Sequence, residues 1–261
     1  MRVGIIQLNA DSNKAANIVR ACSLVVKAAR KGAEFILLPE VFNYRGPLSG
    51  EDLFNEIAED IPGESLFPLM SIAKAEKVNI LAGSIYERKE EGHKVYNTSV
   101  LIDETGHISG KYRKINLFRA EIEGKSIDES RTYEPGTEPV MCLVLGKKIG
   151  LSICFDLRFP ELFRDYYKQH VDMIVLPSSF SQKTGEKHWQ PLLQARAIEN
   201  YCYVLAPNQF GPDGSGVETY GHSMVIDHQG QVQAVLETKQ DDILITDIEF
   251  QPSSHYPTIQ S

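Results

Sequence analysis

Short runs of apolar residues alternate along the chain with longer segments of helical character. In the first half, four apolar runs predict strands, at residues 2–8, 33–38, 78–86 and 98–103. The segment 12–31 carries apolar residues at near-helical spacing and, with 65–77, predicts helices. Gly32 follows the first of these at a position typical of a helix end. Continuous apolar strands separated by helices predict an α/β fold in which helices cover the sheets.

The second half of the chain repeats this order of apolar segments. Four segments have counterparts in the first half: KIGLSICF at 148–155 for RVGIIQL at 2–8, VDMIVLPS at 171–178 for AEFILLPE at 33–40, CYVLAPN at 202–208 for ILAGS at 80–84, and SMVIDHQG at 223–230 for SVLIDETG at 99–106. The last pair keeps one offset of 124 residues, whereas the first pair is offset by 146. Buried strands use a small set of residues, so the similarity can arise with or without an internal repeat. A repeat predicts two similar halves, with two sheets packed on each other and helices outside, in one domain spanning residues 1–261.

Two stretches break the alternation. Residues 111–139 are rich in charge and contain Gly124, Pro135 and Gly136, and residues 211–216 are a shorter stretch of the same kind. Long segments without clear periodicity are often functional rather than simple connectors. Both are therefore predicted to be loops, the longer one with a functional role.

Composition narrows the classes of protein to consider. With 27 basic and 35 acidic residues the net charge is −8, which disfavours electrostatic nucleic-acid binding. No apolar run approaches the roughly 20 residues that span a bilayer, and the N-terminus shows no secretory signal. The four cysteines form no CxxC pair and do not resemble a disulfide framework. The sequence therefore predicts a cytoplasmic protein without nucleic-acid or membrane partners.

Cys154 is a candidate nucleophile. It ends the apolar run 148–153 and is followed by polar residues and an apparent helix start at Pro160. A thiol at the carboxyl end of a strand faces the crevice where α/β sheets bind ligands, and the backbone N–H groups after it can receive an oxyanion. The alternative is that the cysteine is a small apolar residue that ends a strand, which is how Cys22, Cys142 and Cys202 are interpreted.

Two other charged residues are candidates for the same site. Glu40 follows the apolar run Ile-Leu-Leu-Pro, where a carboxylate is costly unless it is paired or functional, and it could serve as a general base. Lys114 could stabilise an oxyanion and a thiolate, although its basic neighbours also fit a solvated turn. By composition alone, Glu129 would be exposed.

Histidines are alternative candidates for the catalytic partner of Cys154. The seven histidines show no zinc-binding spacing, but His188 or His222 could pair with Cys154 as in papain-like enzymes, because such partners need only meet in space. No GxSxG, P-loop or GxGxxG motif occurs, so serine hydrolases and nucleotide-binding enzymes have no support in the sequence.

Three segments together resemble the Glu–Lys–Cys signature of the nitrilase superfamily of carbon–nitrogen hydrolases. They are Leu-Pro-Glu ending at Glu40, Tyr-Arg-Lys-Ile around Lys114, and Cys-Phe-Asp-Leu-Arg-Phe-Pro-Glu from Cys154. The resemblance covers nearly the whole chain, and the segments 184–189 and 220–224 are similar to the branch that holds omega-amidases and deaminated glutathione amidases. It implies a four-layer α-β-β-α sandwich built of two similar halves.

The resemblance also implies roles for individual residues. Cys154 would be the nucleophile, Glu40 the general base and Lys114 the cation near the oxyanion, with the backbone N–H of Phe155 as a second oxyanion donor. Glu129 would orient Lys114 or the substrate amide, and Arg158, Thr184 and His188 are candidate substrate contacts. This sequence has Phe155 where tyrosine is common and Asn116 where histidine is usual. Neither departure touches the Glu–Lys–Cys set.

The implied reaction is hydrolysis of a small linear ω-amide through a thioester on Cys154, releasing an amine or ammonia and a carboxylate. Water is the second reactant, and no metal or organic cofactor is needed. Deaminated glutathione is the preferred substrate, with α-ketoglutaramate or α-ketosuccinamate as the omega-amidase alternative. A homodimer or higher homo-oligomer is expected. A catalytically silent scaffold with the same fold is the alternative from another class.

Overall fold

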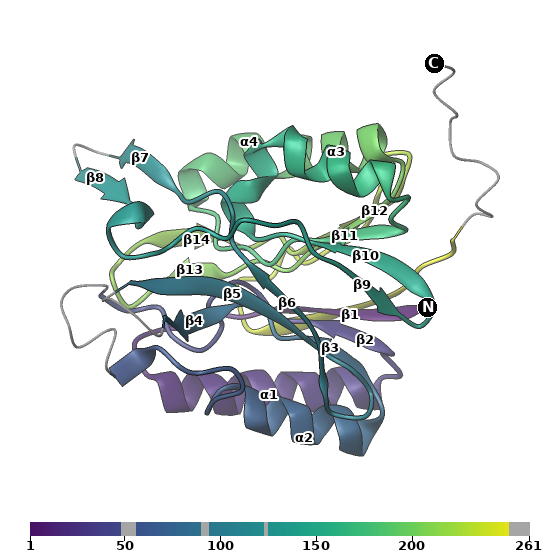
Figure 1. Ribbon diagram of the computed structural model, residues 1–261, viewed down its shortest axis with the longest axis horizontal. Coiled ribbons are helices and arrows are strands. Elements are labelled where there is room, and N and C mark those ends of the chain that lie inside the picture. The colour runs from purple at the N-terminus through teal and green to yellow at the C-terminus, as the bar shows by residue number, and fades with distance from the viewer. Residues whose placement is uncertain (48–55, 90–93, 123–124, 251–261) are drawn as a thin grey trace.

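The structure is a computed structural model that describes residues 1–47, 56–89, 94–122 and 125–250. Two mixed sheets form its centre (Figure 1). The first has the order β17-β1-β2-β3-β5-β4, with β6 also paired to β5. Its strands are β1 (Arg2–Gln7), β2 (Phe35–Leu37), β3 (Asn79–Leu81), β4 (Ile85–Arg88), β5 (Val95–Ile102), β6 (Ile108–Arg113) and β17 (Asp242–Asp247). The second has the order β16-β15-β12-β11-β10-β9. Its strands are β9 (Met141–Val144), β10 (Lys147–Leu151), β11 (Met173–Val175), β12 (Tyr203–Ala206), β15 (Met224–Ile226) and β16 (Val232–Val235).

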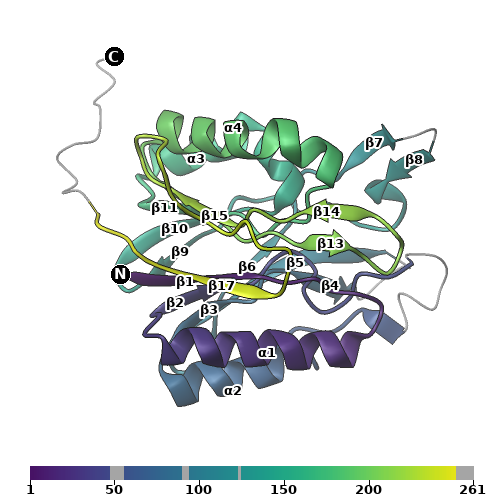
Figure 2. The same ribbon diagram turned by 180° about the vertical axis from the view of Figure 1, so that it is seen from behind.

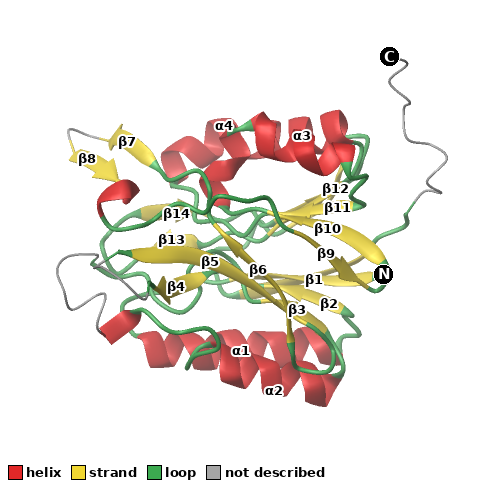
Figure 3. Ribbon diagram, viewed as in Figure 1, coloured by secondary structure: helices red, strands yellow, loops and turns green. Residues whose placement is uncertain are grey.

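Helices cover the outer face of each sheet. The helices α1 (Lys14–Arg30) and α2 (Leu66–Glu76) lie against the first sheet, and α3 (Pro160–Lys168) and α4 (Gln182–Asn200) lie against the second. The view from behind shows the same four layers (Figure 2), and colouring by secondary structure separates the two helical layers from the paired sheets (Figure 3). The predicted α-β-β-α sandwich is confirmed.

The two halves share a strand order, which confirms the predicted repeat. In the first sheet β1, β2 and β3 are parallel neighbours, and β3 pairs antiparallel with β5. In the second, β10, β11 and β12 are parallel neighbours, and β12 pairs antiparallel with β15. The four segments that resemble one another in sequence are these corresponding strands.

Burial on both faces explains the continuous apolar runs. Side chains alternate across a strand, so Val3 and Ile5 of β1 pack between the two sheets, whereas Ile6 packs under the helices of the first half. Both faces of β1 are therefore covered, and its sequence lacks the polar alternation of a half-exposed strand.

Three expectations need correction. Residues 78–86 form two strands, β3 and β4, because the chain turns at Gly83, which has a φ of +41° and lies so close to the carbonyl of Pro39 that a Cβ would clash. The stretch 111–139 is not a simple loop: it contains the end of β6, the hairpin of β7 (Arg119–Ile122) and β8 (Lys125–Asp128), and the 3₁₀ turn η2 (Glu129–Arg131); residues 123 and 124 lie outside the described part. Residues 211–216 belong to a hairpin of β13 (Phe210–Pro212) and β14 (Glu218–Tyr220).

None of the helices in the described ranges is long and apolar enough to cross a membrane.

Candidate active site

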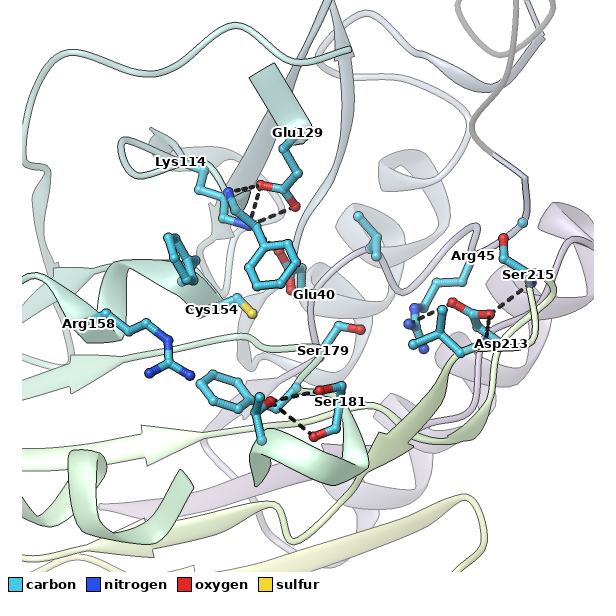
Figure 4. Close-up of a pocket in the computed structure, with 17 residues that line it drawn as sticks. Glu40, Arg45, Lys114, Glu129, Cys154, Arg158, Ser179, Ser181, Asp213 and Ser215 are labelled. Carbon is cyan, nitrogen blue, oxygen red and sulfur yellow. Dashed lines mark hydrogen bonds and ion pairs between the residues drawn. The ribbon is translucent and has the colours of Figure 1, made fainter. Parts of the chain in front are cut away.

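Four predicted residues meet in one cavity of about 280 Å³ between the two halves. Glu40, Lys114, Glu129 and Cys154 all line it (Figure 4). Glu40 follows β2 and Cys154 follows β10, and each strand belongs to the parallel part of its sheet. Lys114 directly follows β6, and Glu129 begins η2. The site therefore lies where parallel strands end, the usual ligand-binding edge of an α/β sheet.

Cys154 has a constrained backbone. Its φ is +45°, a left-handed conformation that non-glycine residues rarely adopt, and it begins the 3₁₀ turn η3 (Cys154–Arg158). Its N–H donates to the carbonyl of Pro177 at 2.9 Å. Strained backbone of this kind persists where the surrounding structure holds it, often at functional sites.

Asp156 connects this turn to the segment that carries Lys114. Its carboxylate accepts hydrogen bonds from the N–H of Ile153 at 2.9 Å and from the hydroxyl of Tyr112 at 2.8 Å. The backbone N–H and the side-chain amide of Asn116 also donate to it, each at 2.9 Å. Asp156 and Tyr112 are both fully buried. Asn116 therefore ties the loop after Lys114 to the turn that begins at Cys154.

Lys114 is held between two carboxylates. Its Nζ lies 3.1 Å from Glu40 Oε1 and 3.1 and 3.0 Å from the two oxygens of Glu129, and its side chain is only 1% exposed. Burial alone would lower the pKa of Lys114, but Glu129 and Glu40 outweigh it and hold that pKa well above its usual value. Burial raises the pKa of Glu129, and Lys114 only partly offsets this effect. Lys114 is therefore a cation throughout the neutral range.

Glu40 has one oxygen committed to this network. Its Oε1 accepts from Lys114 and from the amide of Asn97 at 2.9 Å. Its backbone carbonyl accepts from Gln209 Nε2 at 2.9 Å, so a residue of the second half also fixes it. Glu40 is 4% exposed and lines the cavity.

Cys154 is a neutral thiol in this environment. Burial and the nearby Glu40 carboxylate raise the pKa of Cys154 well above its usual value, and the opposing effects of Lys114 and of the backbone N–H of Ser179 do not cancel this. A thiol with a raised pKa needs a base to take its proton as it attacks. Glu40 is the carboxylate next to it.

The weaker candidates are divided between the cavity and its surroundings. Phe155, Arg158 and Thr184 line the cavity, whereas His188 is not among its lining residues and instead places its Nδ1 3.1 Å from Arg158. His222 is not among them either, and its Nδ1 lies 2.8 Å from the carbonyl of Tyr220. The structure thus brings two carboxylates and a lysine to Cys154, and neither histidine of the papain-like alternative.

Several lining residues were missed from the sequence. Phe118 packs edge-on against Phe155, with ring centroids 5.0 Å apart, and gives the cavity an apolar wall. Arg45 and Asp213 line the cavity from opposite halves and pair at 3.0 Å. Only the positions of these two residues in the sequence could have indicated that they line the cavity. Arg45 lies five residues after Glu40, and Asp213 lies in the stretch 211–216 that breaks the alternation of apolar segments. In the described ranges, no group of three or more histidine, cysteine, aspartate or glutamate side chains is arranged to hold a metal ion.

The sandwich fold and the cavity define a hydrolase of carbon–nitrogen bonds, and comparison with known proteins agrees. The chain belongs to the carbon–nitrogen hydrolase family, whose sequence profile matches residues 2–257. It is an amidase of that family.

Three relatives illustrate the similarity. The chain is 39% identical to omega-amidase NIT2 of Mus musculus over 95% of its own length and 88% of the relative's. It is 36% identical to the deaminated glutathione amidase of Dictyostelium discoideum, over 95% of this chain and 87% of that one. The crystal structure of Nit3 from Saccharomyces cerevisiae, a member of branch 10 of the nitrilase superfamily, matches with a TM-score of 0.83 and 31% identity, over 94% of this chain and 89% of that one.

Proposed function

We propose that the protein hydrolyses a small linear ω-amide through a covalent thioester on Cys154. The observation that carries the proposal is the meeting of Cys154, Glu40 and a buried, doubly paired Lys114 at one cavity. An amidase needs a nucleophile, a base for it and a cation for the developing oxyanion. These three side chains supply one group of each kind.

In the first half of the reaction, Glu40 takes the thiol proton as Sγ attacks the amide carbon. The tetrahedral oxyanion is held by the Lys114 ammonium and the backbone N–H of Phe155. Glu40 then gives the proton to the amide nitrogen, the C–N bond breaks, and an amine or ammonia leaves. The acyl group remains on Cys154 as a thioester.

In the second half, water replaces the amine. Glu40 takes a proton from water as the oxygen attacks the thioester carbonyl, and Lys114 and Phe155 again hold the oxyanion. The C–S bond breaks, the proton returns to the sulfur, and the product leaves as a carboxylate. Glu129 holds Lys114 in place through both halves, and its carboxylate also accepts from the N–H of Phe118 at 2.7 Å.

The substrate we propose bears a carboxylate at the end of its acyl chain. The relatives are named for omega-amidase and deaminated glutathione amidase activities, which supports this class. Arg158 lines the cavity with its guanidinium near the rings of Phe155 and Phe180, and within the described part of the chain its polar contact is with a histidine, His188, rather than with a carboxylate. It is therefore the proposed contact for that carboxylate, with Thr184 as a second candidate in the same cavity. Deaminated glutathione is preferred, and α-ketoglutaramate or α-ketosuccinamate is the alternative.

The experiment that tests this function is a screen for amine and ammonia release over short ω-amides. It includes deaminated glutathione, α-ketoglutaramate and α-ketosuccinamate, with acetamide as an amide that lacks the carboxylate. Release from the carboxylate-bearing amides and little from acetamide supports the proposal. Release from none of them supports a catalytically silent scaffold.

We also propose one catalytic domain over residues 1–261 and a homodimer or higher homo-oligomer. The cavity takes residues from both halves, which supports a single domain. All four cysteines are free thiols, which supports a reducing compartment such as the cytoplasm. Light scattering on the eluted protein measures the oligomeric state.

A further inference from the structure

Arg45 is a buried cation at the wall of the cavity. It follows Glu40 on the loop after β2, and its side chain is 7% exposed. Its Nη2 lies 3.0 Å from Oδ2 of Asp213, which is itself 10% exposed and belongs to the hairpin of β13 and β14. The pair joins the first half of the chain to the second at the cavity.

The surrounding backbone fixes this pair. The N–H groups of Ser215 and Val217 each donate to Asp213 Oδ1 at 2.8 Å, so the carboxylate cannot turn away. The N–H of Gly214 donates to the carbonyl of Arg45 at 2.8 Å, and the N–H of Arg45 donates to the carbonyl of Asp11 at 2.9 Å. The guanidinium is therefore oriented before any ligand arrives.

One end of the guanidinium finds no acceptor among the residues that the structure describes. Arg45 Nη1 is shielded from solvent and has no hydrogen-bond partner within these residues. A buried charged donor without an acceptor is costly, so native structures seldom keep one without a reason. A purely structural ion pair explains Nη2 but leaves Nη1 unexplained. A ligand group that accepts a hydrogen bond from Nη1 accounts for the whole guanidinium. Because Nη1 is shielded from solvent, the side chains that cover it must shift slightly for that group to reach it.

The position of Arg45 indicates which part of a substrate would reach it. The leaving nitrogen must lie near Glu40, which gives it a proton, and Arg45 is on the loop that follows Glu40. Arg158, four residues after Cys154, lies on the opposite side of the cysteine from Arg45 (Figure 4). The acyl chain and the amine portion of an amide extend in opposite directions from the carbonyl carbon. The two arginines can therefore contact opposite ends of one substrate.

We propose that Arg45, oriented by Asp213, is a binding site for a carboxylate on the amine portion of the substrate, which makes secondary amides with a carboxylate at both ends the preferred class. This inference rests on the proposed function and goes beyond it, because a primary ω-amide that releases ammonia would leave Arg45 Nη1 without an acceptor. Deaminated glutathione, whose amine portion ends in glycine, belongs to this class.

The test uses two substrates that differ in one group: deaminated glutathione, and its analogue in which methylamine replaces the terminal glycine. The scissile amide and the acyl chain are the same in both. We expect the kcat/KM of the wild type to be about 10- to 100-fold higher for the first, as befits a hydrogen bond between charged groups. In Arg45→Met this preference should fall to within about threefold of unity.

Two further variants make the result specific. Arg45→Lys can keep the ion pair with Asp213 but lacks the fork of the guanidinium, so it should lose much of the preference while remaining folded. Arg30→Met changes an arginine of α1 whose side chain is 73% exposed, and it should keep the wild-type preference. Calorimetry can compare the binding of intact deaminated glutathione to Cys154→Ala and to Cys154→Ala/Arg45→Met. The Kd should be about 10- to 100-fold higher for the double variant, matching the preference in kcat/KM that Arg45→Met loses.

The outcomes separate the two proposals. If α-ketoglutaramate is hydrolysed but the wild type does not distinguish the matched pair, or if Arg45→Met keeps the preference, the Arg45 site is wrong and the amidase mechanism stands. If no amide is hydrolysed, the proposed function fails and this inference fails with it.

Discussion

Two clusters of glutamate and basic residues flank β6, and they are built in opposite ways. On one face, Glu87 accepts hydrogen bonds from Lys111 Nζ at 2.8 Å and from Arg113 Nε and Nη2 at 2.8 and 2.7 Å. On the other, Lys114 lies between Glu40 and Glu129. The first has one carboxylate and two cations, and the second has one cation and two carboxylates. Because side chains alternate along a strand, Lys111 and Arg113 share a face that Tyr112 and Lys114 do not.

The protonation behaviour of the two clusters differs accordingly. Burial would raise the pKa of Glu87, but hydrogen bonds from Arg113, Lys111 and Thr98 outweigh it and lower that pKa to about 2. Burial raises the pKa of Glu129, and the neighbouring Glu40 adds to the effect. An excess of cations at a partly exposed site keeps a carboxylate charged, whereas an excess of carboxylates around a partly buried thiol favours groups that can exchange protons. This difference marks the first cluster as structural and the second as the proposed catalytic one.

The largest expected effect comes from Cys154→Ala. Because the proposed mechanism forms a bond to Sγ, this variant should lose turnover, by at least about 10⁴-fold in kcat, while its circular dichroism spectrum and Tm stay close to those of the wild type. A near-normal amidase rate in this variant would show that Cys154 is not the nucleophile.

A matched pair of lysine variants sharpens the comparison directly. Lys114→Met should lower kcat/KM by about 100- to 1000-fold, the usual effect of losing one oxyanion donor. Lys111→Met, three residues away, removes one of two cations from Glu87 and should change kcat/KM by less than about threefold. Equal losses in both would mean that the two clusters do not differ in function.

Glu129→Gln tests the second carboxylate of the catalytic cluster. Glutamine keeps an acceptor for Lys114 but removes the charge, so we expect kcat/KM to fall by roughly 10- to 100-fold, mainly through kcat. Glu87→Gln is the control with the same chemical change and should leave kcat/KM close to that of the wild type. An unchanged rate in Glu129→Gln would remove this residue from the proposed mechanism.

Glu87→Gln should instead alter stability, with a defined pH dependence. The pKa of Glu87 is lowered in the folded protein, so its stabilising effect is present above the usual glutamate pKa of 4.5 and is lost as the pH falls toward about 2. Urea unfolding should show the variant less stable by roughly 1–2 kcal/mol at pH 7, allowing for screening by solvent. The difference should shrink as the pH is lowered from about 5 to about 3. A constant difference would contradict the assigned cause.

Among the candidate site residues, the smallest expected effect is that of His188→Ala. His188 contacts Arg158 rather than Cys154, so the variant should lose less than about fivefold in kcat/KM, through a change in KM. If it were more damaging than Lys114→Met, a papain-like Cys–His mechanism would replace the Glu–Lys–Cys mechanism.

Local patterns in the sequence were sufficient to predict the parts that depend on local chemistry. The strands β1 and β2, the helices α1 and α2, the start of α3 and the positions of Glu40 and Cys154 at strand ends followed from apolar runs and the residues that end them, whereas α4 was not predicted. The similar order of the strands in the two sheets followed from the repeat. The position of Glu129 beside Lys114 came from family resemblance, since composition alone placed it in solvent.

Features that depend on distant contacts were not predicted. Arg45 and Asp213 are 168 residues apart and meet only because the two halves pack together. The break between β3 and β4 depends on the close approach of Gly83 to Pro39, which the apolar run 78–86 does not reveal. The β7–β8 hairpin lies in a charged stretch, and each of its strands has only four residues, too few for a periodic pattern to separate a strand from a loop.

The proposed thioester on Cys154 is the central claim, and mass spectrometry of the quenched reaction tests it most directly. The protein is mixed with excess deaminated glutathione, quenched in acid within milliseconds to seconds, and digested. The thioester mechanism predicts a peptide containing Cys154 that is heavier by the mass of the acyl group, that appears during turnover, disappears when substrate is exhausted, and is absent in Cys154→Ala. Steady amine release without any such adduct, or an adduct on another residue, would contradict it.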